Sequence, residues 1–417
     1  FRATPSFGVA YDTRTTGKSF NIEKLPTERR DTDGQTTFSG GNFEEFELPT
    51  TLLVDTQAAH AGESGRENQV QVHLEATNHQ EVDKFQVEHA YVRVWTNTTT
   101  TIGAGKTVSL FGSNGLAPAS IQQSTALIGS GDLGQNNRTQ LRFQRNYAAE
   151  QSNVSWGVGM ESPFQDDFQV DDAVATKLQR WPTLTSNLTF RGANPGDILQ
   201  LGSMIRNVGL QINATDEELF EACYGVSIFG SRVVRDSPTS ISRLYGGFSG
   251  GKGVGQYIRG VSHSSVFHAG NIQILDSTGA YLGTQHRWIN HRGWELSTNL
   301  VYGYAALETP GGGAVANETN NQLHHAWANL FVKTSDQLSY GVEWQYGRRE
   351  TFADGNGENH RLFFGIQITS APPSSPKTQK IFYGESSHSY QENALLTDTD
   401  LFNEREYRQS FAHRQGL

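Results

Sequence analysis

The chain has 417 residues, a single cysteine and a formal net charge of −10. Only 35% of the residues are hydrophobic, with a mean hydropathy of −0.53, although aromatic residues reach 11%; this argues against several conventional cores, which hold about 45% apolar residues. No stretch approaches the roughly 20 apolar residues of a membrane-spanning helix, one cysteine excludes a disulfide framework, and the acidic balance argues against a nucleic-acid partner.

A two-residue hydrophobic period recurs along the chain, and this period predicts β-strands with one apolar and one polar face. The clearest segments are 70–77, 140–144, 154–161, 294–304, 338–347 and 361–368. Less regular segments lie near residues 6, 46, 85, 102, 184, 198, 222, 241, 280 and 323. Together they predict roughly sixteen strands of about 8 to 12 residues, the length that a tilted strand needs to cross a bilayer.

The character of the two faces favours a membrane barrel over a soluble β-sandwich, solenoid or propeller. The polar face carries Gly, Gln, Ser, Arg and Glu, which suit a water-filled interior, whereas Trp288, Tyr302, Tyr304, Trp344 and Tyr346 stand where interfacial aromatic girdles are expected. Short links at 290–293 and 334–337 alternate with long ones at 162–182 and 305–321. The prediction is an all-β, transmembrane, antiparallel up-and-down β-barrel over residues 1–370, followed by a C-terminal periplasmic extension over 371–417.

Two adjacent segments, 85–93 (FQVEHAYVR) and 102–111 (IGAGKTVSLF), resemble the paired strands before the constriction loop of the DcaP-like trimeric porins of Gram-negative outer membranes. Further similar segments are 137–143 (NRTQLRF), 201–206 (LGSMIR), 284–288 (TQHRW) and 338–350 (LSYGVEWQYGRRE). Two departures are a missing N-terminal helical extension and a barrel that does not end on a terminal aromatic residue.

The resemblance implies a sixteen-stranded homotrimeric channel in the bacterial outer membrane. It implies passive diffusion of small polar solutes, mainly small anions such as dicarboxylates, with outer-membrane lipid and lipopolysaccharide around the barrel. It also implies an inward-folded constriction loop after the fifth strand, here 113–136, which carries Asp132.

The strand period also predicts which charged side chains line the pore. The cations on the polar faces are Arg93, Arg142, Arg206, Arg287 and Arg361, and the acids are Glu75, Glu161, Glu295 and Glu343. Opposed charges across a narrow lumen produce a transverse field, and a row of arginines favours carboxylate-bearing solutes. The alternative is that these residues pair along the wall and stiffen the barrel.

Other motifs do not support catalysis, and the sequence predicts neither an enzyme nor a required cofactor. The segment 247–251 (GFSGG) matches a nucleophile elbow, but no helix follows it. Residues 103–107 (GAGKT) resemble part of a phosphate-binding loop but read as a strand, and the histidines at 262, 268, 324 and 325 lack metal-ligand spacing. Asp166, Asp167, Asp171 and Asp172 form an acidic loop group that is a candidate for Ca²⁺, against the alternative of solvated loop charge.

The segment after residue 370 has a different composition. It opens with a Pro- and Ser-rich linker at 371–376 and continues with a weakly helical pattern to residue 414. In a barrel with an even number of strands both ends lie in the periplasm, so this segment is expected to pack under the barrel, plug it or bind a periplasmic partner. A barrel that serves as a structural anchor or adhesion protein through its loops and tail is the alternative function, and a soluble β-rich carbohydrate-active protein is a second one.

Overall fold

The computed structural model describes most of the predicted barrel. Its described residues are 6–12, 36–39, 51–61, 67–79, 84–97, 99–112, 116–118, 120, 127–130, 137–149, 152–163, 168–169, 175–178, 180–194, 196–237, 239–261, 263–268, 270–289, 294–308, 319–335, 338–352 and 355–368. The expected C-terminal extension, 371–417, lies outside them.

Antiparallel strands make up nearly all of the described chain. The strands of the main sheet are β1 (Ser6–Asp12), β2 (Thr36–Ser39), β3 (Thr51–Ala61), β4 (Glu67–His79), β5 (Lys84–Trp95), β6 (Thr100–Val108), β7 (Asn137–Ala149), β8 (Ser152–Glu161), β10 (Ala175–Leu178), β11 (Thr183–Arg191), β12 (Ile198–Ile212), β13 (Glu217–Ser237), β14 (Ser240–Lys252), β17 (Asp276–Ile289), β18 (Glu295–Glu308), β19 (Asn320–Lys333), β20 (Leu338–Thr351) and β21 (Asn356–Ile368). A second, three-stranded sheet contains β9 (Phe168–Gln169), β15 (Ser265–His268) and β16 (Asn271–Ile274), and a single-turn helix, η4, spans Gly255–Tyr257.

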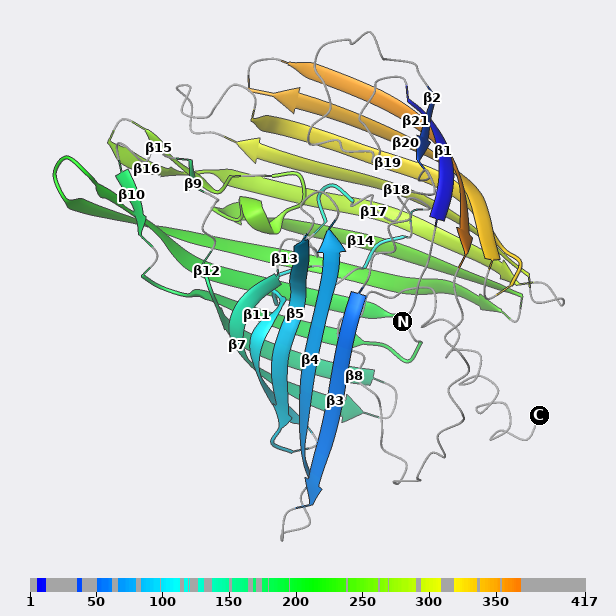
Figure 1. The fold of residues 1–417 in the computed structure, drawn as a ribbon, viewed down its shortest axis with the longest axis horizontal. Coiled ribbons are helices and arrows are strands. Elements are labelled where there is room, and N and C mark those ends of the chain that lie inside the picture. Colours follow the sequence, from blue (N-terminus) through cyan, green and yellow to red (C-terminus); the bar gives the residue numbers. More distant parts are fainter. Residues whose placement is uncertain are drawn as a thin grey trace.

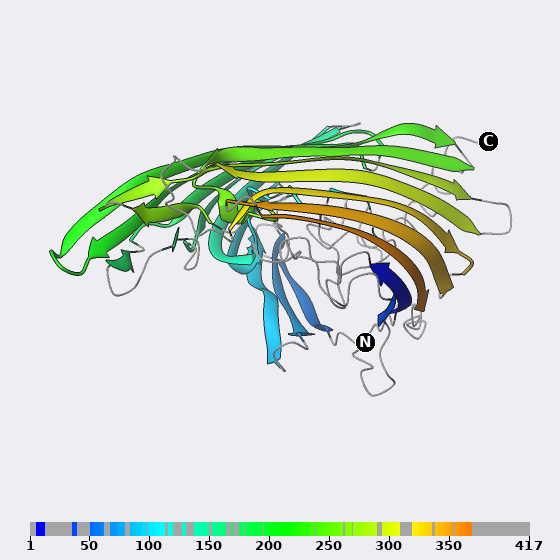
Figure 2. The same cartoon turned by 90° about the horizontal axis from the view of Figure 1, so that it is seen from above.

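The main sheet is an up-and-down meander. It has eighteen strands, of which β2 and β10 are only four residues long, so sixteen longer strands form the wall. Their antiparallel pairings run without interruption from β3 to β21, and β21 pairs in turn with β1, the first strand of the chain. Figure 1 shows this order as a continuous colour gradient across neighbouring strands, and Figure 2 shows how strongly the sheet curves. The predicted fold class and strand number are confirmed.

The predicted alternation between the two faces of the wall is also confirmed. On β18 the side chains of Leu300 and Tyr302 are exposed, whereas those of Asn299 and Val301 are buried. The same pattern holds on β21, where Phe364 is exposed and the neighbouring residue Phe363 is buried. Apolar residues therefore face outward, as lipid requires, and the opposite face turns towards the barrel interior.

The two ends of the barrel differ in the length of their connections. At the end where β21 finishes and β1 begins, the links 150–151, 192–197, 238–239 and 334–337 are short. At the opposite end the chain makes the long connections 109–136, 162–182, 253–275 and 309–319. These are called the short-turn end and the long-loop end below.

Some strand boundaries differ from the predictions. Ten of the sixteen wall strands have 13 residues or more, so the expected length of about 8 to 12 was wrong for most of the wall. The longest strands form one hairpin, in which β12 has 15 residues and β13 has 21. The strand expected near residue 46 is described from Thr51 onwards, and the segment 162–182 contains β9 and β10.

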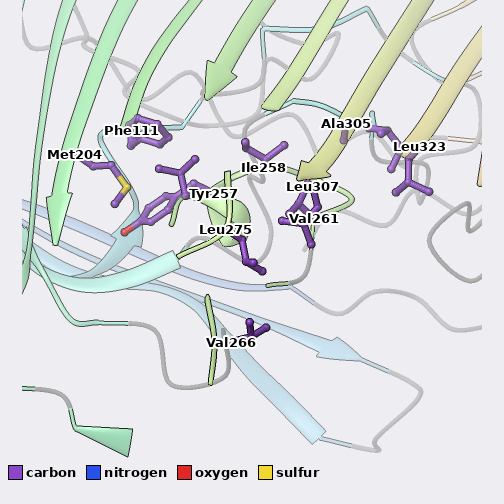
Figure 3. Packing of buried hydrophobic residues seen from close by; sticks show 12 residues of the cluster. Phe111, Met204, Tyr257, Ile258, Val261, Val266, Leu275, Ala305, Leu307 and Leu323 are labelled. Atoms are coloured by element: carbon purple, nitrogen blue, oxygen red, sulfur yellow. The ribbon is translucent and has the colours of Figure 1, made fainter. Parts of the chain in front are cut away.

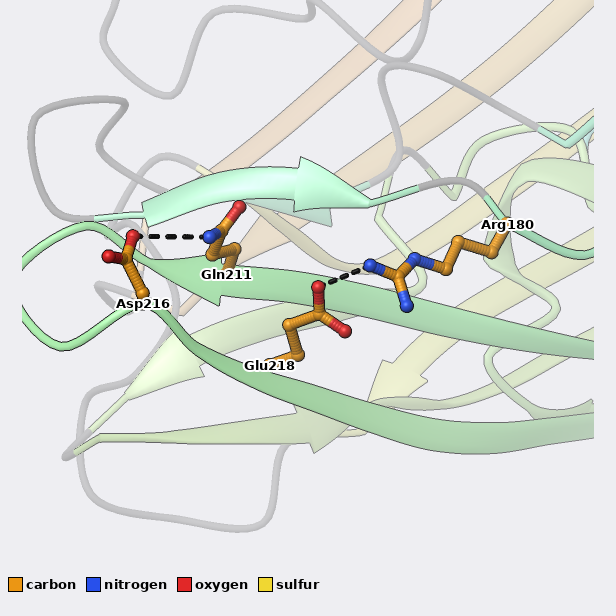
Figure 4. A network of polar contacts seen from close by, with 4 residues as sticks. All are labelled: Arg180, Gln211, Asp216 and Glu218. Carbon is orange, nitrogen blue, oxygen red and sulfur yellow. Dashed lines mark hydrogen bonds and ion pairs between the residues drawn. The ribbon is translucent and has the colours of Figure 1, made fainter.

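The tip of this hairpin is held by polar contacts at the long-loop end. Gln211 donates to Asp216 at 3.2 Å and Arg180 pairs with Glu218, as Figure 4 shows. Asp216 has a φ of 55°, a left-handed conformation that Asp tolerates better than most residues because its short side chain bonds locally. The hairpin therefore continues past the ends of its neighbours with its turn polar and exposed.

Candidate functional site: the narrowed barrel interior

The chain enters the barrel interior directly after β6, the fifth strand of the wall in chain order. The described parts of residues 109–130, named the first inward segment, pack against the interior faces of β12, β13, β14, β17, β18 and β19. Leu116 and Leu127 share a cluster with wall residues Phe229, Tyr281 and Trp327, all of which are buried. The segment predicted as a constriction loop, 113–136, thus contributes residues that lie on the inner wall, while Asp132 itself lies outside the described residues.

The backbone of the first inward segment is fixed by polar side chains of the wall. Gln200 on β12 donates its amide to the Gly112 carbonyl at 2.7 Å, and Ser227 on β13 donates its hydroxyl to the Phe111 carbonyl at 2.9 Å. Further along, the Tyr281 hydroxyl donates to the Leu116 carbonyl. A segment without regular structure needs such partners, because a buried carbonyl without one costs free energy comparable to a lost hydrogen bond.

Glycines in the wall let this segment come close. A Cβ atom at Gly303 would lie 2.1 Å from the Ile128 carbonyl oxygen, and one at Gly283 would lie 2.6 Å from Pro118. Within the segment, Gly129 has a φ of 78°, and a Cβ atom there would lie 2.0 Å from the Tyr304 carbonyl oxygen. Several of the small inward residues that the alternation pattern assigned to a wet face therefore accommodate protein backbone.

A second piece of chain also lies inside the barrel, and the sequence analysis missed it. Residues 253–261, named the second inward segment, follow β14 and include η4. Val254, Tyr257, Ile258 and Val261 are buried there in one cluster with Phe111 of the first inward segment and with the wall residues Met204, Ala305, Leu307 and Leu323. Figure 3 shows Tyr257 beside Phe111, whose rings meet edge to face at 5.3 Å, with Met204 next to them.

The two inward segments are bonded to each other. The Arg259 backbone N–H donates to the Ser130 carbonyl at 2.9 Å, and the Gly129 N–H donates to the Arg259 carbonyl at 2.9 Å. A signal for the second segment is present in the sequence as the loss of alternation after Lys252, where Gly253, Gly255 and Gly260 interrupt a run of apolar residues.

The five arginines predicted to line the pore all lie on the interior face, between 0% and 8% exposed. Three of them have hydrogen bonds to the wall, to the inward chain or to a neighbouring acid. Arg142 donates to the Val108 carbonyl and to Gln140, Arg206 donates twice to the Gly253 carbonyl at 2.9 and 3.2 Å, and Arg287 makes a two-pronged bond to Glu295 at 2.5 and 2.8 Å. The guanidinium of Arg93 lies over the rings of Tyr91 and Trp95, and Arg361 is fully buried on β21.

The predicted acids have equally specific contacts. Glu343 on β20 accepts hydrogen bonds from Ser120 of the first inward segment at 2.6 Å, from Asn329 at 2.8 Å and from Gln345. Glu161, the last residue of β8, is also fully buried and is described below. Glu75 lies in β4 but its side chain is outside the described residues, as are Asp166, Asp167, Asp171 and Asp172.

These contacts correspond closely to the alternative in which the charged residues brace the barrel. Arg287 and Glu295 are such a wall pair, and Arg142 bonds within the wall to the end of β6 and to β7, whereas Arg206, Glu161 and Glu343 hold the inward segments. Their charges are fixed next to the lumen, because buried side chains with several partners have little freedom to rearrange. Together, these charged residues determine where the inward segments lie and set the electrostatic potential around them.

Glu161 brings four elements together. Its Oε1 accepts hydrogen bonds from the Ser109 hydroxyl at 2.9 Å, the Leu110 N–H at 3.2 Å and the Thr185 hydroxyl at 2.7 Å. Its Oε2 accepts one from the Tyr257 hydroxyl at 3.3 Å. Burial, and secondarily the charge of Glu161, raises the pKa of Tyr257, so this phenol stays protonated and remains a donor.

The interior does not have the features of an enzyme site in the described part of the chain. Ser249 of the segment 247–251 is buried within β14 and extended on both sides, which is incompatible with a nucleophile elbow. Residues 103–107 belong to β6, as expected. No group of three potential metal ligands occurs among the described residues, and none of the helices in that part has the length and apolarity of a membrane span.

Comparison with known proteins identifies the family. A family profile described as DcaP outer membrane protein matches residues 74–366, well over half of the chain. The chain belongs to the DcaP outer membrane protein family. It is therefore a protein of the bacterial outer membrane, and the alternative of a soluble carbohydrate-active protein is wrong.

Solved structures of outer membrane proteins are similar to this member of the DcaP family. The outer membrane channel DcaP of Acinetobacter baumannii has a TM-score of 0.67 at 17% identity, covering 88% of this chain and 96% of that one. Two weaker similarities are to OmpT of Vibrio cholerae (TM-score 0.49, 9% identity, 88% and 96% covered) and to an anion-selective porin from Comamonas acidovorans (TM-score 0.48, 10% identity, 89% and 100% covered). The first supports the barrel fold. Among curated protein sequences, none matches this chain.

Proposed function

We propose that this DcaP-family protein is a passive diffusion channel for small polar solutes. The observation that carries the proposal is the barrel itself. Its exterior is apolar, its interior face carries arginines, glutamates and amides beside the apolar clusters that hold the two inward segments, and these segments narrow it. A barrel of this strand number encloses a lumen wide enough for an aqueous path. The similar Acinetobacter protein is named an outer membrane channel, which supports the same function here without covalent chemistry.

We further propose that the channel prefers small anions, including dicarboxylates. Six arginines are buried on the interior face, the five predicted ones and Arg243 of β14, and they outnumber the acids described there, Glu161, Glu295 and Glu343. Because the arginines are buried beside a low-dielectric wall, their fields extend into the lumen with little screening. A negatively charged solute would be favoured there even though the whole chain carries a net charge of −10.

The reversal potential of single channels across a KCl gradient tests this preference. We expect chloride selectivity for the wild type, reduced in Arg142→Ala because one fixed positive charge is lost. Arg142→Lys is the matched control: it keeps the charge but loses the planar fork that holds Val108 and Gln140, so it should retain selectivity. Cation selectivity in the wild type, or selectivity that Arg142→Ala leaves unchanged, would contradict the anion preference. A small dicarboxylate should in addition lower the chloride current by competing for the same region.

The same bilayer recordings distinguish a channel from the alternative function, a structural anchor or adhesion protein. An anchor whose interior is plugged would insert without conducting. The proposed extension 371–417 bears on this choice, since a tail that plugs the barrel would increase conductance when it is removed, and one that binds a periplasmic partner would change the proteins that co-purify. Ca²⁺ at the acidic group 166–172 stays a candidate cofactor of the loops.

We also propose that the protein is a homotrimer surrounded by outer-membrane lipid and lipopolysaccharide. The proposal rests on the likeness of its strand motifs to trimeric porins and on the outward apolar face. Chemical cross-linking of the purified protein in detergent should give a trimer ladder, and conductance steps should come in threes. A protein that runs and conducts as a monomer would contradict the trimer.

A further inference from the structure

The hydrogen bonds of Glu161 connect parts of the chain that are far apart in sequence. Ser109 and Leu110 begin the first inward segment, Thr185 belongs to β11, and Tyr257 belongs to the second inward segment. Glu161 itself ends β8, at the long-loop end of the wall. One buried carboxylate therefore receives two donors from the first inward segment, one from the second and a fourth from the neighbouring wall strand.

The remaining contacts make this joint stiff. Ser109 both donates to Glu161 and accepts the Phe111 N–H at 3.1 Å, which shapes the turn after β6. The ring of Phe111 then packs on Tyr257. At the other end of the first inward segment, the backbone bonds from Gly129 N–H to the Arg259 carbonyl and from Arg259 N–H to the Ser130 carbonyl repeat the connection. Displacing one segment would thus break contacts made by the other.

From this arrangement we propose that Glu161 is a positioning residue that couples the two inward segments, so that they set the width of the channel as one unit. The inference rests on the proposed channel function and adds to it the residue on which the pore dimension depends. It requires no ligand or cofactor, only the four donors already present around the carboxylate.

Charge and burial explain why this residue type suits the role. A carboxylate offers about four acceptor positions and no donor, so it can satisfy several converging N–H and O–H groups. Hydrogen bonds to an ionised group are roughly twice as strong as neutral ones. Leaving the donors unpaired in this dry place would cost more than it would at the surface.

Two conservative variants separate the coupled unit from two independent segments. Tyr257→Phe keeps the ring that packs on Phe111 and removes only the donor to Oε2, whereas Ser109→Ala removes a donor to Oε1. Single-channel recordings of the full chain in planar bilayers measure the conductance levels. We expect each variant to show one additional conductance level, and this level should have the same conductance in both variants. Its occupancy should be about tenfold higher than in the wild type, because one hydrogen bond to a charged group is lost.

The double variant and a control complete the test. The double variant should spend a larger fraction of time at this additional conductance level than either single variant. Glu161→Ala should also spend a larger fraction of time there than either single variant. Ser186→Ala removes a hydroxyl that pairs with Ser203 on the outward face, and it should behave like the wild type. Heat-modifiable gel mobility verifies that each variant is folded, and the two conservative variants decide the matter even where Glu161→Ala does not fold.

The possible results are distinguishable. Two displaced levels of different size would mean that the segments move separately and would overturn the coupling, as would channels indistinguishable from the wild type. A wild type that inserts but never conducts would instead overturn the proposed function, and with it the inference that rests on it.

Discussion

At position 303 a single hydrogen atom replaces what would be a side chain between the barrel wall and the first inward segment. The missing Cβ atom would lie 2.1 Å from the Ile128 carbonyl oxygen and 2.9 Å from Leu127. The first of these neighbours is backbone, which cannot rotate away as a side chain could. The absence of a side chain at this position of β18 therefore sets how closely the first inward segment can approach the wall.

Gly303→Ala should consequently displace the first inward segment or destabilise the barrel. We expect a cost of about 1–3 kcal/mol, the usual range for overpacking a filled interior. The temperature at which the folded form converts to the slow-migrating form on gels measures it. Gly103→Ala is the matched control, because a Cβ atom there has its nearest neighbour at 3.8 Å. Equal transition temperatures for the two variants would contradict the close approach.

Among the elements, the second inward segment depends on few anchors. At its start, Arg206 provides two hydrogen bonds to the Gly253 carbonyl. Further along, the segment is held by the Tyr257–Glu161 bond, by the backbone bonds of Arg259 and by the apolar cluster around Tyr257 and Ile258. Since Arg206 stands on β12, loss of its side chain would release the segment at the point where it leaves β14.

Arg206→Ala should expose the second inward segment to trypsin, which cleaves after Arg259. We expect the cleavage rate to rise roughly tenfold or more, because hydrogen bonds to charged groups are worth about 1.5–3 kcal/mol and each 1.4 kcal/mol is a factor of ten. Arg232→Ala is a suitable control, since Arg232 is an exposed residue of β13. Cleavage at the wild-type rate would show that the apolar cluster, Glu161 and the first inward segment hold this segment without Arg206.

Strands were predictable from the sequence because alternation is a local signal, readable within a single segment such as 338–347. The same parity assigned Arg142, Arg206 and Glu343 to the interior face. Their partners could not be predicted, since Ser109 lies 52 residues from Glu161 and Ser120 lies 223 residues from Glu343. The second inward segment was missed for a related reason: its apolar residues follow neither a strand nor a helix period, and they are buried only through contacts with distant strands.

On the scale of the whole molecule, the outward face must match a lipid environment across all sixteen strands. Leu282 near the middle of β17 is 67% exposed, and many other outward aliphatic residues, among them Leu300 and Ile205, are also exposed. In water such an apolar surface would be unfavourable. In hydrocarbon an apolar surface carries no such cost, whereas a charged group there is unfavourable. The barrel is thus stable only with its exterior in a membrane or detergent.

Leu282→Lys should destabilise the barrel in lipid vesicles by about 2–4 kcal/mol, the cost of a lysine facing the bilayer midplane. Urea unfolding followed by tryptophan fluorescence measures the change. Leu282→Ala is the control, because it shortens the side chain without adding a charge and should cost much less. If both variants unfolded at the same urea concentration, the β17 surface would have to face water.

The pairing of β1 with β21 places residues that are far apart in the sequence in register, with Phe7 opposite Ile366. A ribosome releases the last strand long after the first, so the seam between them is absent from any partial chain. Folding must then be completed after synthesis, with a holding factor or insertion machine shielding the unpaired edge in the meantime. This seam, rather than any single strand, is where assembly of the barrel would stall.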